Sequence, residues 1–140
     1  MSHLDRAKEI LKNNSYTCVV CKSDKTFTST DRGVKPLVLW HESGEDMKNG
    51  SAADKVVGRG AAFLYLLLGI RELYAHVISK PALELLSKNG VDVSYGILAD
   101  NIINRHGNGI CPFEAAVLDI TDPREAYIAI TQKMKEMNIR

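Results

Sequence analysis

The apolar run over residues 61–70 constrains the fold more than any other feature of the sequence. It holds ten residues and includes Tyr65 and Gly69. A helix that spans a bilayer needs about 20 apolar residues, so this run is too short for a transmembrane segment. We predict that it belongs to a long helix over residues 52–68, which is apolar on nearly every face. Such a helix must be covered by other elements, as in a layered α/β domain.

The remaining patterns alternate between strands and helices. Strands are predicted over residues 15–21, 26–29, 73–79 and 91–95, and helices over residues 4–13, 81–88 and 112–118 and from residue 121 onward. The first two strands are expected to form a hairpin. Residues 36–40 fit either a buried strand or a short helix, and Pro36 with Gly44 favours the helix. We therefore expect one domain over residues 1–140, a three-layer α/β/α sandwich around a mixed sheet.

The charges of the chain are nearly balanced. Lys and Arg total 18, Asp and Glu total 17, and the formal net charge is +1. This composition gives no general attraction to nucleic acid or to an anionic membrane, so neither is expected as a partner. The start of the chain lacks a signal-peptide pattern. Cys18, Cys21 and Cys111 are therefore expected to be free thiols in the reducing cytoplasm.

Cys18 and Cys21 lie three residues apart in a predicted strand. Side chains alternate between the two faces of a strand, so these two sulfurs are expected on opposite faces. They would then share neither a disulfide nor a metal ion, and we interpret them as packing residues. His41 and His76 have no partner at a metal-ligand spacing. No metal or other cofactor is expected.

The segment 111–114 (CPFE) is the most specific local pattern. Pro112 suits the first position of a helix, which places Cys111 at the cap, where the helix dipole favours a thiolate. Cys111 is therefore a candidate nucleophile, with His106 in the preceding loop as an assisting group. The alternative is that Cys111 packs as a small apolar residue while Glu114 interacts with exposed backbone amides.

A second candidate feature is a ligand site at one edge of the sheet. Lys55, in the first turn of the predicted helix, and Lys80, after a predicted strand, are expected to approach the same carboxyl edge, where anions are attracted to helix starts. The alternative is that these lysines are simply solvated. The candidate catalytic residues are Cys111, Glu114 and Asp54, and the candidate ligand-binding residues are Ser51, Lys55, Ser79, Lys80, Asn104, Arg105 and His106.

Two segments, residues 51–58 (SAADKVVG) and 111–114 (CPFE), resemble the bacterial domain-of-unknown-function family 1893. The similarity extends over almost the whole chain and includes the strand end at residues 77–79. That family is similar in fold to the cytidine deaminases. The resemblance therefore implies a cytidine-deaminase-like sheet with helices on both faces and a site at the starts of two helices.

Deaminase chemistry needs a zinc set at those helix starts. A His or Cys with a nearby Glu opens the first helix, and Pro-Cys-x-x-Cys opens the second. Residues 51–55 (SAADK) and 79–84 (SKPALE) supply neither set. The leading hypothesis is therefore a domain that binds a small anionic or nucleotide-like ligand without zinc, with enzymatic activity left open. The competing hypothesis is a non-catalytic regulatory or assembly module, which forms a homodimer through an apolar segment at residues 37–40 or 61–70.

Overall fold

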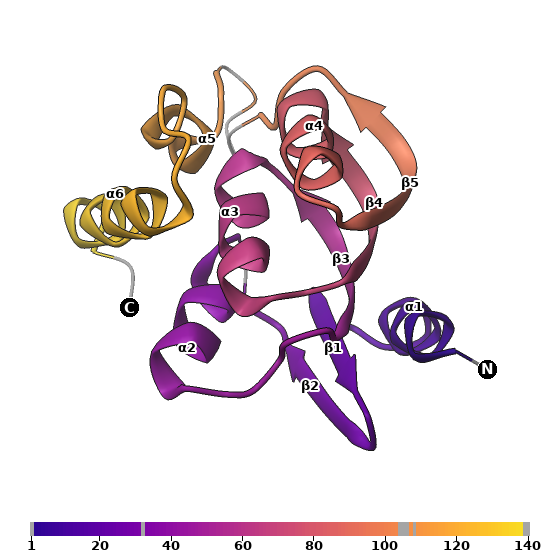
Figure 1. Ribbon diagram of the computed structural model, residues 1–140. Coiled ribbons are helices and arrows are strands. Elements are labelled where there is room, and N and C mark those ends of the chain that lie inside the picture. The colour runs from indigo at the N-terminus through magenta and orange to yellow at the C-terminus, as the bar shows by residue number, and fades with distance from the viewer. Residues whose placement is uncertain (1, 32, 104–106, 108, 139–140) are drawn as a thin grey trace.

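Five strands form one mixed sheet in the computed structural model, which describes residues 2–31, 33–103, 107 and 109–138 (Figure 1). The strands are β1 (Cys18–Lys22), β2 (Lys25–Ser29), β3 (Ser51–Val57), β4 (Glu72–Ser79) and β5 (Asp92–Ala99). Their order across the sheet is β2-β1-β3-β4-β5. β1 is antiparallel to β2 and β3, whereas β3, β4 and β5 are parallel to one another.

Helices cover both faces of the sheet, which confirms the predicted α/β layers. They are α1 (His3–Asn13), α2 (Lys35–Ser43), α3 (Arg59–Leu68), α4 (Lys80–Lys88), α5 (Pro112–Ala116) and α6 (Pro123–Glu136). α3 and α4 connect the parallel strands and lie side by side on one face, with α2, α5 and α6 packed around α3 (Figure 1). α1 lies on the other face, where it packs on β1 and β3 and reaches Tyr74 of β4. None of the helices in the described part of the chain is long and apolar enough to cross a membrane.

The long helix predicted over residues 52–68 is wrong in its first half. Residues 51–57 form the central strand β3, and the helix begins only at Arg59, after Gly58 in an extended conformation. Ala52 and Ala53 are both fully buried, one in the core beneath α3 and the other beneath α1. A strand covered on both faces is apolar at successive positions, and periodicity alone does not distinguish it from a buried helix.

The other predicted elements are present. Residues 22 and 25 close the predicted hairpin between β1 and β2. The ambiguous segment at residues 36–40 is helical, and Gly44 ends α2 in the left-handed conformation at φ 74°. β5 continues to Ala99, which is farther than the alternation at residues 91–95 indicated. The structure therefore corrects the boundaries of the sheet at β3 and β5.

Three helices begin with a side-chain cap. Ser2, Ser79 and Asp122 each accept a hydrogen bond from the backbone N–H three residues later. Such a cap satisfies one of the amides that have no partner within the first turn of a helix. Ser79 is both the last residue of β4 and the cap of α4, so the strand and the helix meet at this residue.

The core is divided unequally by the sheet. The larger cluster lies between the sheet and α2–α6 and includes Cys18, Phe63 and Tyr65. The smaller cluster lies beneath α1 and includes Cys21 and Ala7. Cys18 and Cys21 therefore face opposite sides of the sheet, which confirms the prediction from strand alternation.

The parallel strands do not alternate strictly along their length. Asp54 and Val57 are both buried although they lie three residues apart, and β4 repeats this spacing at Ala75 and Ile78. In a regular strand, two residues share a face only when they lie an even number of positions apart. Asp54 contacts Tyr65 of the same core cluster that contains Val57, so β3 departs from regular alternation. The register pairs Val56 with Val77, and Val77 with Ile97 of β5.

Candidate functional site

The residues predicted to form one site lie in three separate regions of the fold. Glu114 and Ser79 meet at the carboxyl ends of the parallel strands. Asp54 lies inside the core between β3 and α3. Ser51 is the first residue of β3, at the opposite end of the sheet, where its Oγ donates a hydrogen bond to Glu72 Oε1 at 2.5 Å.

Glu114 is buried, with 5% of its surface exposed. Its Oε1 accepts hydrogen bonds from Ser79 Oγ at 2.6 Å and from the backbone N–H of Arg59 at 3.1 Å. Its Oε2 accepts from the backbone N–H of Ile102 at 2.6 Å. Arg59 is the first residue of α3, so the carboxylate lies at a helix start, where the dipole favours a negative charge. One side chain thus joins α5, the starts of α3 and α4, and the segment after β5.

Two glycines give α5 the room to approach the start of α3. A Cβ at Gly58 would lie 2.9 Å from Glu114 Cγ and 3.2 Å from Ile102 Cγ1. A Cβ at Gly60 would lie 3.1 Å from the backbone oxygen of Phe113. A backbone oxygen cannot rotate away as a side chain can, so a larger residue at position 60 would force α5 and α3 apart, whereas at position 58 it would displace the side chain of Glu114.

Lys80 follows Ser79 and lies at the molecular surface. Its Nζ forms an ion pair with Asp100 Oδ1 at 2.8 Å, and both side chains are exposed. The hydrogen bond to Asp100, with its charge, raises the pKa of Lys80, and the same contact lowers the pKa of Asp100. Exposed pairs of this kind contribute little to stability. Lys80 already has an anionic partner within the chain.

Cys111 caps α5, as the sequence predicted, and Pro112 follows in the first turn. Its side chain makes no capping hydrogen bond, and it is half-buried against the larger core cluster. Its backbone N–H donates to Ile102 O at 2.8 Å. α5 has five residues, and a helix this short carries a small dipole. The reactivity of Cys111 remains a prediction.

Asp54 is buried, with 6% of its surface exposed, in a cluster with Tyr65 and Cys18. Tyr65 donates a hydrogen bond from its hydroxyl to Asp54 Oδ2 at 2.6 Å, and Cys18 Sγ lies 3.1 Å from the same hydroxyl. The backbone N–H of Val56 donates to Asp54 Oδ1 at 3.3 Å. Among the described residues, no Lys, Arg or His nitrogen forms an ion pair with Asp54.

Burial controls the acid–base behaviour of this cluster. Removal from water raises the pKa of Asp54 to about 6, although the hydrogen bond from Tyr65 opposes the shift. Burial also raises the pKa of Tyr65 and of Cys18 well above their ordinary values, and the nearby Asp54 adds to both effects. Burial favours the neutral form of each acid, so Cys18 and Tyr65 stay protonated at neutral pH.

Two other predicted groups lie apart from these clusters. Lys55 is exposed in the middle of β3, next to the buried Asp54, and not in the first turn of a helix as predicted. Asn104, Arg105 and His106, which were predicted near the mouth of the site, lie outside the described residues.

The sequence interpretation missed three polar residues. Tyr65 lies within the apolar run. The predicted helix over residues 52–68 placed it about three turns away from Asp54, too far for a contact. Recognising residues 51–57 as a strand would have brought Tyr65 back over Asp54, because a helix that follows a strand packs on the sheet. Cys18 joins them through the register of β1 against β3, which pairs it with Asp54. Arg59, the third, lies between the two glycines.

Arg59 borders a groove between α4 and the segment that links α5 to α6. The groove has a volume of about 200 Å³. Arg59 donates from Nη2 to the backbone oxygen of Ile120, and its guanidinium carbon lies 5.2 Å from the centroid of the Phe63 ring. Its Nε is buried and has no hydrogen-bond partner among the described residues. The groove is lined by both charged and apolar residues.

The described residues include no group of three or more His, Cys, Asp and Glu side chains placed to hold a metal ion. The zinc ligands of a deaminase are also missing from the sequence at the start of α4, where Pro81 follows Lys80. The polar chemistry at the strand ends is therefore that of a carboxylate bound by two amides and a hydroxyl.

Comparison with known proteins agrees with this fold. The crystal structure of a DUF1893 family protein (TM1506) from Thermotoga maritima is similar, with a TM-score of 0.85 and 31% sequence identity. The similarity covers 94% of this chain and 89% of that chain. No curated protein matches the chain. Residues 6–134 match the family TM1506, described as a domain of unknown function (DUF1893). The chain therefore belongs to the DUF1893 family.

Proposed function

We propose that this protein is a non-catalytic assembly module that forms a homodimer through the free edge of β5. The proposal rests on β5, an edge strand with exposed apolar side chains and no protecting charge between Asp92 and Asp100. Among the described residues, β5 lies at the end of the sheet and pairs only with β4. Its other side therefore presents backbone N–H and C=O groups to solvent, which is a template for pairing with another strand.

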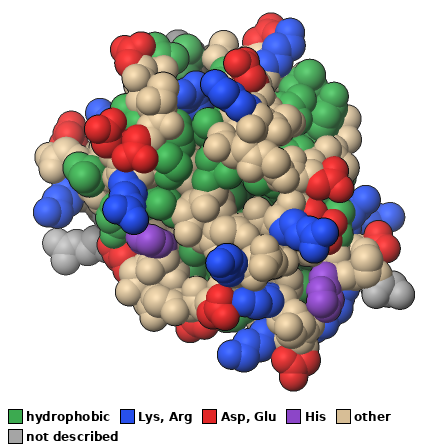
Figure 2. Space-filling model, in the orientation of Figure 1, with side chains coloured by type: hydrophobic (Ala, Val, Ile, Leu, Met, Phe, Trp, Pro, Cys, Tyr) green, Lys and Arg blue, Asp and Glu red, His purple; other side chains and the backbone are tan. Residues whose placement is uncertain are grey.

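Three large apolar side chains of β5 are exposed. Tyr95, Ile97 and Leu98 have 43%, 52% and 37% of their surfaces exposed. Figure 2 shows hydrophobic side chains at the surface in this part of the molecule, at the upper right. Between Asp92 and Asp100, the seven residues 93–99 carry no charge. Native proteins usually protect such an edge with lysine, proline or a short strand, and β5 has none of these within its span.

The opposite edge of the sheet is protected in the expected way. β2 has five residues and begins with Lys25. Arg6 from α1 donates to the hydroxyl of Thr26, and Phe27 packs edge-on against Trp40. Of the two edges of the sheet, β5 is therefore the one suited to pairing with another subunit. A single pairing edge favours a closed dimer over an open chain of subunits.

The polar residues predicted from the sequence also favour the assembly module over the ligand-binding domain. Glu114 and Ser79 form hydrogen bonds within the fold, and Lys80 is paired with Asp100. A nucleotide-like or anionic ligand held by Lys55, Lys80 and backbone amides would have to replace the ion pair of Lys80 with Asp100. The ligand hypothesis therefore has weaker support at these residues than the assembly hypothesis has at β5.

The test is the mass of the protein in solution for two matched variants. Ile97→Lys places a charge on β5, and Ile128→Lys places the same charge on α6, where Ile128 is 66% exposed. We expect the wild type and Ile128→Lys to sediment as dimers at micromolar concentration, and Ile97→Lys to sediment as a monomer. A monomeric wild type up to about 100 µM, a range in which standard-sized interfaces are saturated, would refute the proposal.

A further inference from the structure

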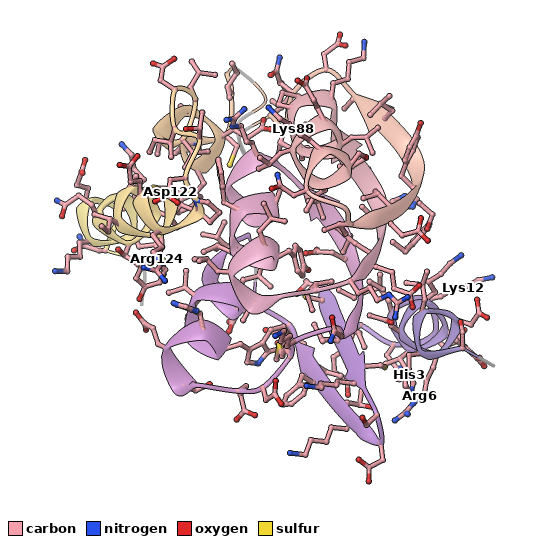
Figure 3. The ribbon with its side chains drawn as sticks, in the orientation of Figure 1. His3, Arg6, Lys12, Lys88, Asp122 and Arg124 are labelled. Atoms are coloured by element: carbon pink, nitrogen blue, oxygen red, sulfur yellow. The ribbon has the colours of Figure 1, made fainter. Side chains whose placement is uncertain are left out.

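We propose that the groove between α4 and the α5–α6 connection binds a small metabolite through an oxyanion group, either phosphate or carboxylate. The groove is distinct from the β5 edge and from the cluster around Asp54. One side of the groove is the face of α4 that carries Glu84 and Lys88. The other side is formed by Arg59 and Thr121. Figure 3 shows Lys88 on α4, with Asp122, the neighbour of Thr121, across from it at the start of α6.

Arg59 is the residue that points to an anion. Its guanidinium is held in place by Ile120 O and lies over the ring of Phe63. It forms no ion pair with any carboxylate among the described residues, and its buried Nε lacks an acceptor there. A half-buried cation without a counter-ion is costly, and a guanidinium forms strong hydrogen bonds with the oxygens of a carboxylate or phosphate.

The other residues that line the groove indicate the charge and polarity of its ligand. Lys88 is exposed, and no described carboxylate forms an ion pair with it, so a second cation is available opposite Arg59. Among the lining residues, Glu84 supplies one negative charge against the two positive charges of Arg59 and Lys88. Pro81 and Leu85 give it an apolar wall. The arrangement fits an anionic group attached to a small, partly apolar body.

The size of the groove limits the ligand further. Its volume of about 200 Å³ is smaller than that of sites that enclose drug-sized molecules, which have roughly 300–1,000 Å³. A complete nucleotide would therefore extend into solvent. Asn89 and Thr121 add neutral hydrogen-bonding groups at the two sides of the groove. We assign the groove to a short organic phosphate or carboxylate.

The test uses inorganic phosphate and acetate as separate probes on the full chain. Each probe is titrated into ¹⁵N-labelled protein, with sodium chloride at the same ionic strength as the reference. We expect saturable shifts in the amide signals of Lys88, Asn89 and Thr121 with at least one probe. Preference for phosphate or for acetate identifies the class of oxyanion. Shifts that follow ionic strength alone with both probes would overturn the assignment.

Two lysines in equivalent positions provide matched variants. Lys88 and Lys12 both lie in the last turn of a helix, on opposite sides of the sheet (Figure 3). Lys88→Gln should weaken binding about tenfold, as expected for the loss of one charge-assisted contact, and Lys12→Gln should leave binding unchanged. Arg59→Gln should abolish binding. If Arg59→Gln fails to fold, the lysine pair decides, and equal affinity in both lysine variants would refute the site.

Discussion

Glu114 and Asp54 are both buried carboxyl groups, and the protein surrounds them in opposite ways. Glu114 accepts hydrogen bonds from two backbone amides and a hydroxyl, which belong to three different segments. Asp54 lies in an apolar core and depends on one phenol and one amide. The difference shows that burial alone does not define the role of an acid. Glu114 connects elements, whereas Asp54 is an acid whose charge the core opposes.

Replacement of Glu114 tests its connecting role and should have the largest effect. Glu114→Ala leaves the amides of Arg59 and Ile102 and the hydroxyl of Ser79 without their acceptor. We expect a loss of about 3–5 kcal/mol in the free energy of unfolding. Glu114→Gln should lose about 1–2 kcal/mol, because its NH₂ group would face a donor. Urea unfolding followed by circular dichroism measures both values.

The exposed Glu84 supplies the control for this comparison. Glu84→Ala should change the free energy of unfolding by no more than about 0.5 kcal/mol. A Glu114→Ala variant as stable as the Glu84→Ala variant would show that the hydrogen bonds to Glu114 do not hold the segments together.

The pH dependence of stability tests the description of Asp54. The pKa of Asp54 is raised to about 6 in the folded protein from 3.8, so folding favours the protonated form. Its contribution to stability is fully present below about pH 4 and is lost as the pH rises through about 6. The total loss is on the order of 3 kcal/mol. Asp54→Asn should remove this decline, so the variant should exceed the wild type in stability at pH 7.5.

Unfolding curves of the wild type and Asp54→Asn, recorded in parallel from pH 4 to pH 8, isolate this group from the other carboxyl groups of the chain. The difference in stability between the two proteins should grow with pH. A constant difference would mean that Asp54 titrates alike in the folded and unfolded chains, and the contrast with Glu114 would then rest on geometry alone.

Tyr65→Phe should have a smaller effect on stability than Glu114→Ala or Asp54→Asn. It removes the hydroxyl that donates to Asp54 and keeps the buried ring. We expect a loss of about 1–2 kcal/mol at neutral pH. Because this hydrogen bond lowers the pKa of Asp54, its removal should raise that pKa further. Carbon-13 NMR of the Asp54 carboxyl group measures the midpoint, and an unchanged midpoint would contradict the proposed contact.

The sequence predicted the layers of the fold because most elements carry local signals. Pro36 and Gly44 marked the ends of α2, and the alternation of strand residues placed Cys18 and Cys21 on opposite faces. The central strand β3 was missed because its first four residues are all buried, so they show no alternation of buried and exposed positions. The likeness to the cytidine deaminases remains a prediction.

The candidate site was harder to predict because its contacts are distant in the sequence. The cap position of Cys111 follows from Pro112, which is a local signal. The contacts of Glu114 with Arg59 and Ser79 depend on how α5 packs, and no local pattern contains that information. The Asp54 cluster depended on the assignment of β3, so one error in secondary structure hid both Tyr65 and Cys18.

The hydrogen bond from the Arg59 amide to Glu114 spans 55 residues. During synthesis from the N-terminus, all five strands are therefore synthesised before Glu114, the acceptor for the start of α3. Contacts of such sequence separation form late and slow folding. A nascent chain that ends after β5 would have all five strands and an incomplete helix start. Synthesis of residues 111–116 then supplies the acceptor for the start of α3.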